Sequence, residues 1–123
     1  MNPPDTSASD HLVFDANVLG AMFGDDAAVI ASVLETFLVS TRDNLPKLAV
    51  AAAAQNLDGV AELAHKMTGA CRMSGAQALG YAARSIEEAA KRGDAASVLQ
   101  GIANVQTQWT LLLAAIKITD SPR

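Results

Sequence analysis

The chain has 123 residues, half of them hydrophobic, which is enough for one domain with a single core. Its 13 acidic and 9 basic residues give a formal net charge of −4, which argues against nucleic acid as a partner, since binding to nucleic acid depends on basic side chains that neutralise phosphates. With one cysteine, Cys71, and two histidines, His11 and His65, the sequence excludes an intramolecular disulfide and any metal site rich in cysteine or histidine.

The N-terminal part of the sequence predicts a tail followed by a short helix. Residues 1–12 contain Pro, Asp, Ser and Thr without an apolar period, and we expect them to be a disordered tail. Asp15 is suited to cap a helix over residues 16–23, because its carboxylate can accept the free N–H groups of the first turn. Gly24 is suited to end that helix.

A long second helix is predicted over about residues 26–54, with Asp25 and Asp26 available as its cap. Its apolar face recurs in steps of three and four residues: Ile30, Leu34, Phe37, Thr41, Leu45, Leu48 and Ala52. Pro46 lies inside this span and would interrupt a straight helix. Because the apolar phase continues past Pro46, we expect one kinked helix rather than two.

Two shorter helices should follow. Asp58 is expected to cap a third helix that ends near Met73. Ser74 and Gln77 match an S-x-x-Q capping box, which predicts the start of a fourth helix that stops at Gly93. Within the fourth helix, the polar pair at residues 87–88 is expected on a solvated face.

Asp94 is expected to cap a fifth helix with an unbroken apolar stripe: Val98, Ile102, Val105, Trp109, Leu112 and Ile116. No segment alternates with the period of a strand, and the connections are short, so neighbouring helices should run antiparallel. The sequence therefore predicts an all-α fold. We expect an up-and-down antiparallel four-helix bundle with a short extra N-terminal helix over residues 13–118, and a C-terminal tail at 119–123.

One histidine has the position of a reactive group. His65 follows Ala64 on the third helix, hence about 100° around the axis from the apolar stripe, where the helix meets solvent. Its helical neighbours Ala61, Thr68 and Gly69 have small side chains, so a partner could approach the ring closely. The simpler interpretation is a solvated histidine with no chemical role.

The surroundings of His65 indicate an anion. Lys66 is adjacent and Arg72 lies seven residues on, nearly on the same face, and two cations beside an imidazole suit a phosphate group. Gly69 costs about 1 kcal/mol relative to Ala inside a helix. We infer that this position needs an open surface or a close approach.

Short motifs in order along the chain carry a family resemblance: Phe14-Asp15, Leu19, Gly24-Asp25-Asp26, Phe37-Leu38, the string Ala-His-Lys-Met-Thr-Gly at 64–69, Gly75, Leu79, Ile86-Glu87 and Gly93-Asp94. Over about residues 13–116 they resemble the histidine-containing phosphotransfer (HPt) domain found at the C-terminus of hybrid sensor histidine kinases. The resemblance implies that His65 accepts a phosphoryl group from a receiver-domain aspartyl phosphate and passes it to another receiver aspartate.

The sequence departs from the family at one position. A lysine usually stands three residues after the histidine, where this chain has Thr68, while Lys66 follows the histidine directly. Thr68 could donate a hydrogen bond to a phosphoryl oxygen, and Arg72 could restore the missing charge. The face expected to bind the phosphoryl group and the partner consists of Ala61, Lys66, Thr68, Gly69 and Arg72 around His65.

The resemblance also implies the partners, which are receiver domains of response regulators or of a hybrid sensor kinase. We expect these receivers to supply Mg²⁺ and the acidic pocket, and we expect this chain to be a monomer that binds no cofactor. The chain lacks a phosphate-binding loop, an ATP-covering glycine loop and a carboxylate cluster for Mg²⁺. ATP-dependent kinase activity is therefore not expected.

No apolar run approaches the roughly 20 residues of a membrane-spanning helix, and the N-terminus is acidic and polar, unlike a signal peptide. We expect a cytoplasmic domain, either free-standing or at the cytoplasmic end of a membrane-bound sensor kinase. The alternative function is a non-catalytic interaction domain that docks a receiver or another partner without phosphorylation. An enzyme with His65 as general base is disfavoured, because local spacing pairs no nucleophile with it and Cys71 lies on another helix face.

Overall fold

The computed structural model describes residues 12–120, and these form five α-helices and no strand. The helices are α1 (Ala16–Phe23), α2 (Ala27–Ala53), α3 (Leu57–Ser74), α4 (Gln77–Lys91) and α5 (Ala95–Asp120). The all-α prediction is confirmed. Residues 1–11 and 121–123, which make up most of the two expected tails, lie outside the described residues.

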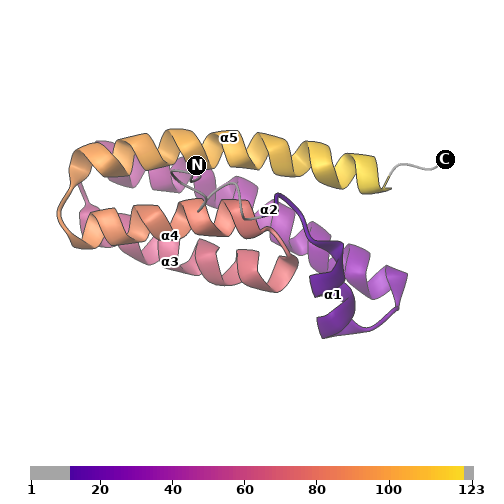
Figure 1. Cartoon of the computed structure of the whole chain (residues 1–123). Coiled ribbons are helices and arrows are strands. Elements are labelled where there is room, and N and C mark those ends of the chain that lie inside the picture. Colours follow the sequence, from indigo (N-terminus) through magenta and orange to yellow (C-terminus); the bar gives the residue numbers. More distant parts are fainter. Residues whose placement is uncertain (1–11, 121–123) are drawn as a thin grey trace, which may run out of the picture.

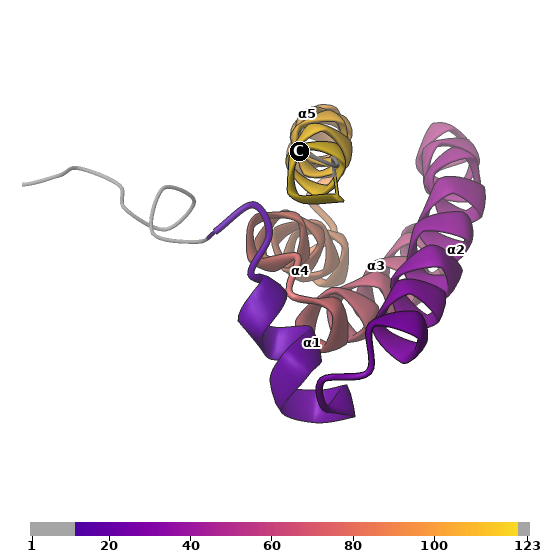
Figure 2. The same ribbon diagram turned by 90° about the vertical axis from the view of Figure 1, so that its right-hand side faces the viewer.

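The four longer helices lie lengthwise beside one another, and α1 packs at one end of them against α3 and α2 (Figure 1). Seen along the helices, α4 lies between α3 and α5, and α2 covers another side of α3 (Figure 2). None of the helices described over residues 12–120 is both long and apolar enough to cross a membrane.

The core forms where the apolar stripes of α2 to α5 meet. Its large, fully buried side chains include Leu48, Val60, Leu79, Ile86, Val98, Val105 and Leu112. The apolar face of α4 is buried along its whole length, and its alanines, among them Ala82, Ala83 and Ala90, let α3 and α5 pack closely on either side. On α5 the stripe is only partly buried at Trp109 and Ile116.

Three of the predicted helix caps are confirmed. The Asp15 carboxylate accepts a hydrogen bond from the Asn17 N–H at 3.0 Å, and Gly24 follows the last residue of α1. The Asp26 carboxylate accepts from the N–H groups of residues 28 and 29 at the start of α2. Asp94 accepts from the backbone N–H of Ser97 at 3.1 Å at the start of α5. These bonds satisfy N–H groups that have no partner inside the helix.

The prediction that α2 is one helix is also confirmed, because the helix continues through Pro46 without a break. Pro46 is exposed. Arg42, whose carbonyl loses its helical partner because proline has no N–H, is exposed as well, so water can reach that carbonyl.

The predicted start of α3 was wrong by two residues. Asn56, not Asp58, caps this helix, and its side-chain oxygen accepts a hydrogen bond from the Gly59 N–H at 3.1 Å. Asp58 lies within the first turn, where its negative charge interacts favourably with the helix dipole.

The predicted capping box at the start of α4 was also wrong. Ser74 is the last residue of α3 and is buried, and the cap of α4 is Ala76, which makes no side-chain bond. Gly75 ends α3 with a φ of 81°, a left-handed conformation that glycine adopts without strain. Gln77 bonds instead to the segment before α1, donating from Nε2 to Oδ2 of Asp15 at 3.3 Å.

This segment is bound to the corner between α3 and α4 by main-chain hydrogen bonds. The N–H of Asp15 donates to the carbonyl of Gly75 at 2.8 Å, and the N–H of Ala78 donates to the carbonyl of Leu12 at 2.9 Å. A Cβ at position 75 would overlap the Asp15 carbonyl oxygen, so only glycine fits there. Residues 12–15 thus fix α1 against the hairpin of α3 and α4.

Two glycines make a matched test of this packing. A Cβ on Gly101 would lie 2.6 Å from Cγ1 of Ile86, a fully buried residue, whereas a Cβ on Gly20 would meet nothing within 4 Å. We expect Gly101→Ala to lower the free energy of unfolding by about 1–3 kcal/mol, because overpacking outweighs the gain in helix propensity. Gly20→Ala should raise it by up to about 1 kcal/mol. Urea denaturation followed by circular dichroism measures both, and equal effects of the two substitutions would contradict the close contact of α5 with α4.

Candidate functional site

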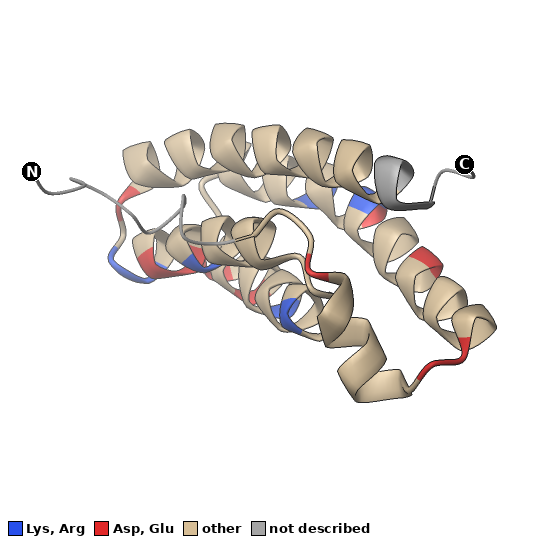
Figure 3. Cartoon of the chain, turned by 45° about the vertical axis from the view of Figure 1, so that its right-hand side comes forward, with Lys and Arg blue, Asp and Glu red and all other residues tan. Residues whose placement is uncertain are grey.

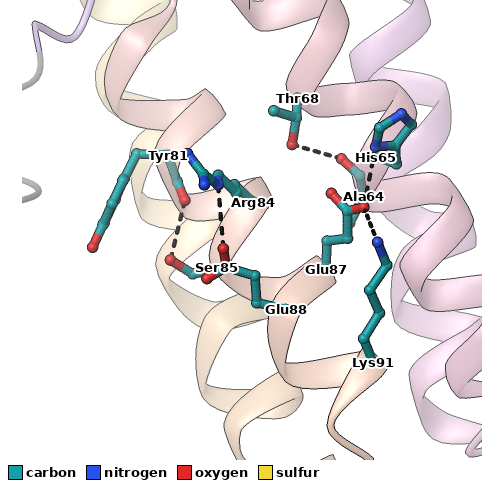
Figure 4. A network of polar contacts seen from close by, with 9 residues as sticks. All are labelled: Ala64, His65, Thr68, Tyr81, Arg84, Ser85, Glu87, Glu88 and Lys91. Atoms are coloured by element: carbon teal, nitrogen blue, oxygen red, sulfur yellow. Dashed lines mark hydrogen bonds and ion pairs between the residues drawn. The ribbon is translucent and has the colours of Figure 1, made fainter.

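His65 lies in the middle of α3 on the side that faces α4, and its side chain is 76% exposed. The ring Nδ1 lies 3.1 Å from Oε2 of Glu87 on α4, and the same oxygen lies 3.0 Å from Nζ of Lys91 (Figure 4). One carboxylate oxygen therefore joins the imidazole to an ammonium group. The contact ties the histidine of one helix to two polar residues of the next.

Glu87 is the inner member of this group, with a side chain that is only 12% exposed. Burial on its own raises the pKa of its carboxyl, but hydrogen bonds and charge from Lys91, together with His65, outweigh burial and lower the pKa below its ordinary value. An ionised carboxylate only accepts hydrogen bonds, so Nδ1 of His65 is protonated and donates to Glu87. In the neutral ring the lone pair is then on Nε2, which has no hydrogen-bond partner among residues 12–120.

A hollow of about 370 Å³ opens beside the ring, and we refer to it as the His65 hollow. From α3 it is lined by His65, Thr68, Gly69 and Arg72, and from α4 by Arg84, Glu87, Glu88 and Lys91. Three of these residues are cations. Figure 3 shows the charged residues on α2, α3 and α4, while α1 has none and α5 has none over residues 95–116. Against these three cations stand the two carboxylates of Glu87 and Glu88, so the lining of the His65 hollow has one net positive charge, which favours a small anion over a cation.

The structure brings some of the predicted residues together and leaves others apart. Thr68, Gly69 and Arg72 line the His65 hollow, as the sequence analysis expected of residues on one face. Lys66 is exposed but lies outside the hollow, and so does Ala61. The charged groups next to the ring thus come from α4, and Lys66 does not contribute one.

Thr68 does not have the expected hydrogen-bonding role. Its hydroxyl is buried and donates to the carbonyl of Ala64 at 2.9 Å within α3. Because a hydroxyl has one proton, Thr68 is not placed to donate to a phosphoryl oxygen.

Gly69 is exposed, and a Cβ added there would meet nothing within 4 Å. Packing inside the domain therefore does not require glycine at this position, although glycine inside a helix costs about 1 kcal/mol relative to alanine. The absent side chain leaves open space one turn from His65.

Sequence reasoning missed the contribution of α4. Glu87 was expected on a solvated face, but it is buried against His65. The available signal was the spacing of Arg84, Glu87, Glu88 and Lys91, which places all four on one side of a helix. That spacing does not say which residue of α3 lies opposite, so it could not reveal the contact.

Two other kinds of site find no support in the described residues. Cys71 is buried, and burial raises the pKa of its thiol to about 12, so it is not an available nucleophile. Over residues 12–120, no three His, Cys, Asp or Glu side chains are grouped so that they could hold a metal ion.

A helical domain with an exposed histidine, oriented by a carboxylate and flanked by cations from a neighbouring helix, has the arrangement of a phosphohistidine carrier. The family model of the Hpt domain matches residues 32–118, from within α2 almost to the end of α5. The chain belongs to the Hpt domain family. Comparisons with curated proteins and with solved structures give no match.

Membership of this family defines the general activity. Hpt domains carry out phosphotransfer in two-component phosphorelays, and they interact with receiver domains. The matched region contains His65 and the whole of α3 and α4, so the site described above lies inside the family domain.

The Glu87 contact generates a prediction on stability and pH. Because the folded protein lowers the pKa of Glu87, its ionised form stabilises the fold above the unfolded pKa of about 4.3, and this contribution is lost as the pH falls through the folded pKa. We expect Glu87→Gln to lower the free energy of unfolding by about 0.5–1 kcal/mol at pH 7 and by less at pH 3. Urea denaturation at both pH values measures this difference.

The control is Glu88→Gln, which removes an exposed carboxylate one position along and should change stability little at either pH. A difference between wild type and Glu87→Gln that stays the same from pH 7 to pH 3 would contradict the proposed ionisation of Glu87.

Proposed function

We propose that this domain accepts a phosphoryl group from the aspartyl phosphate of a receiver onto Nε2 of His65 and passes it to the aspartate of another receiver. The observation that supports this proposal is the contact between Nδ1 and Glu87, which leaves Nε2 as the nucleophilic nitrogen of an exposed ring. A histidine that served only as a surface contact would not need a buried carboxylate to orient it.

In the forward step, the Nε2 lone pair attacks the phosphorus atom. The N–P bond forms as the P–O bond to the receiver aspartate breaks, and the aspartate leaves as a carboxylate. The ring then has both nitrogens substituted and carries a positive charge, which the Glu87 carboxylate beside Nδ1 stabilises. The reverse step, toward a second receiver, uses the same geometry.

The phosphoryl group brings about −1.5 to −2 charges, which cations in the His65 hollow would offset. Lys91 lies at the far side of Glu87, and Arg72 lies two turns along α3 from His65. Lys66 and Ala61 lie outside the hollow, and we assign them to the surrounding face that docks the receiver. The alternative is a domain that docks a receiver without phosphorylation. It requires the docking face, but it does not require that Glu87 orient the ring of His65.

Several finer points belong to the same proposal. We propose that helices α2 to α5 form an up-and-down antiparallel bundle, that the domain works as a cytoplasmic monomer, and that it has no ATP-dependent kinase activity. The receiver, not this chain, would hold the Mg²⁺ required for transfer.

The direct test is labelling with phosphate from a receiver charged by acetyl phosphate. We expect wild type to gain acid-labile, base-stable phosphate and His65→Gln to gain none, with an unchanged circular dichroism spectrum. His11→Gln is the control and should be labelled as wild type is. Label on His65→Gln, or its loss from His11→Gln, would contradict the assignment, and receiver binding without any label would support the docking-only alternative.

A second test uses the open space at Gly69. We expect Gly69→Glu to slow transfer at least tenfold, because a long negative side chain would project beside the ring and repel the phosphorylated receiver. Gly69→Ala should raise stability by up to about 1 kcal/mol. Gln100→Glu, which adds the same charge on an exposed position of α5, is the control and should transfer at the wild-type rate. Unchanged transfer by Gly69→Glu would place the docking face elsewhere.

A further inference from the structure

The chain has no lysine three residues after His65, and the residue at that position, Thr68, is neutral and turned into the helix toward the Ala64 carbonyl. A cation that binds a phosphoryl group at that level of α3 must therefore come from another helix. The pairing of α3 with α4 shows which residue of α4 is at the same level.

Two contacts fix this pairing. His65 meets Glu87, and six residues further along α3 the Cβ of Cys71 lies 3.0 Å from the place of a Cβ on Gly80. The two helices therefore run in opposite directions along this contact. Thr68 lies between His65 and Cys71, so it is opposite the stretch of α4 between residues 80 and 87, where Arg84 is the basic residue.

The cavities agree with this register. A second hollow of about 310 Å³ lies beside the His65 hollow, and Thr68, Arg72 and Arg84 line both. Arg84 is thus on the wall shared by the two hollows, at the level of Thr68. That level is one helical turn, about 5.4 Å, from the level of His65.

We propose that Arg84 binds the phosphoryl oxygens on His65 and takes the place of the missing lysine from the opposite helix. This inference rests on the proposed phosphorylation of His65. Arg84 has an exposed side chain, and its ion pair with Glu88 at 3.2 Å uses Nε (Figure 4). The terminal nitrogens of the guanidinium group are the donors that can bind two phosphoryl oxygens at once.

The other cations near the ring are less suited to this role. The Nζ of Lys91 lies 3.0 Å from Glu87 and is held there. Lys66 lies outside the His65 hollow, and Arg72 is a further turn of α3 away from His65 than Thr68 is. Arg84 is the cation at the level of Thr68. Its ion pair with Glu88 is exposed and contributes little to stability, so breaking it to bind a phosphoryl group costs little free energy.

The experiment compares transfer by the full chain and by Arg84→Gln, which keeps the length of the side chain and removes the charge. We expect Arg84→Gln to accept phosphate from a charged receiver at least tenfold more slowly, and Arg84→Lys to retain part of the rate. The control, Arg92→Gln, removes an exposed arginine of the same region outside the hollow and should transfer at the wild-type rate. Wild-type transfer by Arg84→Gln, or equal loss in Arg92→Gln, would overturn the proposal.

Rescue separates a phosphoryl contact from a structural or docking effect. We expect Thr68→Lys to restore transfer in the Arg84→Gln chain, because it returns the cation to α3. Labelling with phosphoramidate, a donor too small to need docking, should be slowed by Arg84→Gln as well. A loss seen only with the receiver would show that Arg84 contacts the receiver instead.

Absence of label from wild-type His65 with either donor would refute the proposed function itself, whereas equal labelling of wild type and Arg84→Gln refutes only the role of Arg84.

Discussion

The close packing of α3 on α4 is the constraint on which the functional site depends. The two helices meet through small residues, with Ala64 and Ala83 fully buried and Gly80 directly against Cys71. Residues of this size let the backbones of α3 and α4 approach closely. A shift of one helix along the other would bring a larger side chain into the place of Gly80, where a Cβ already meets Cys71. The position of Glu87 beside His65 is a consequence of this fixed register, since neither residue reaches the other by local spacing.

The proposed phosphorylation of His65 requires a site that holds a phosphoryl group only temporarily. Glu87 is buried and ionised, so the orientation of the ring is set before a partner arrives. The cations around the hollow are exposed, and water and salt weaken their attraction to a phosphate. Under the proposed function, a phosphoryl group among such exposed cations would stay accessible to the next acceptor. A deep cationic pocket would favour retention over transfer.

The sequence was a good guide to local features and a poor one to contacts between helices. Asp15, Asp26 and Asp94 cap helices as expected, because capping depends only on neighbours in the chain. The Ser74 cap failed because α3 extends through Ser74 to a left-handed Gly75, and the segment before α1 takes up the bonding of Gln77. A pattern of four residues could not show that distant segment.

The same distinction applies to the candidate site. The exposed position of His65 and the open surface at Gly69 followed from helical periodicity. Glu87 and Arg84 did not, because periodicity places residues on a face but does not say how far one helix is shifted along another. The burial of Thr68 and its bond to Ala64 likewise needed the structure, since a threonine can bond to the carbonyl four residues back or point to solvent.

The attachment of residues 12–15 to the corner of α3 and α4 has a consequence for how such a domain can diversify. Two of its hydrogen bonds join backbone to backbone, at Gly75 and Ala78, and backbone groups are the same for nearly every amino acid. Apart from the glycine at 75 and the bonds of Gln77 to Asp15 and Leu12, this attachment does not depend on particular side chains. Substitutions on the exposed side of α1 can therefore accumulate without moving α1 on α3, while the geometry of the ring and its carboxylate stays as it is.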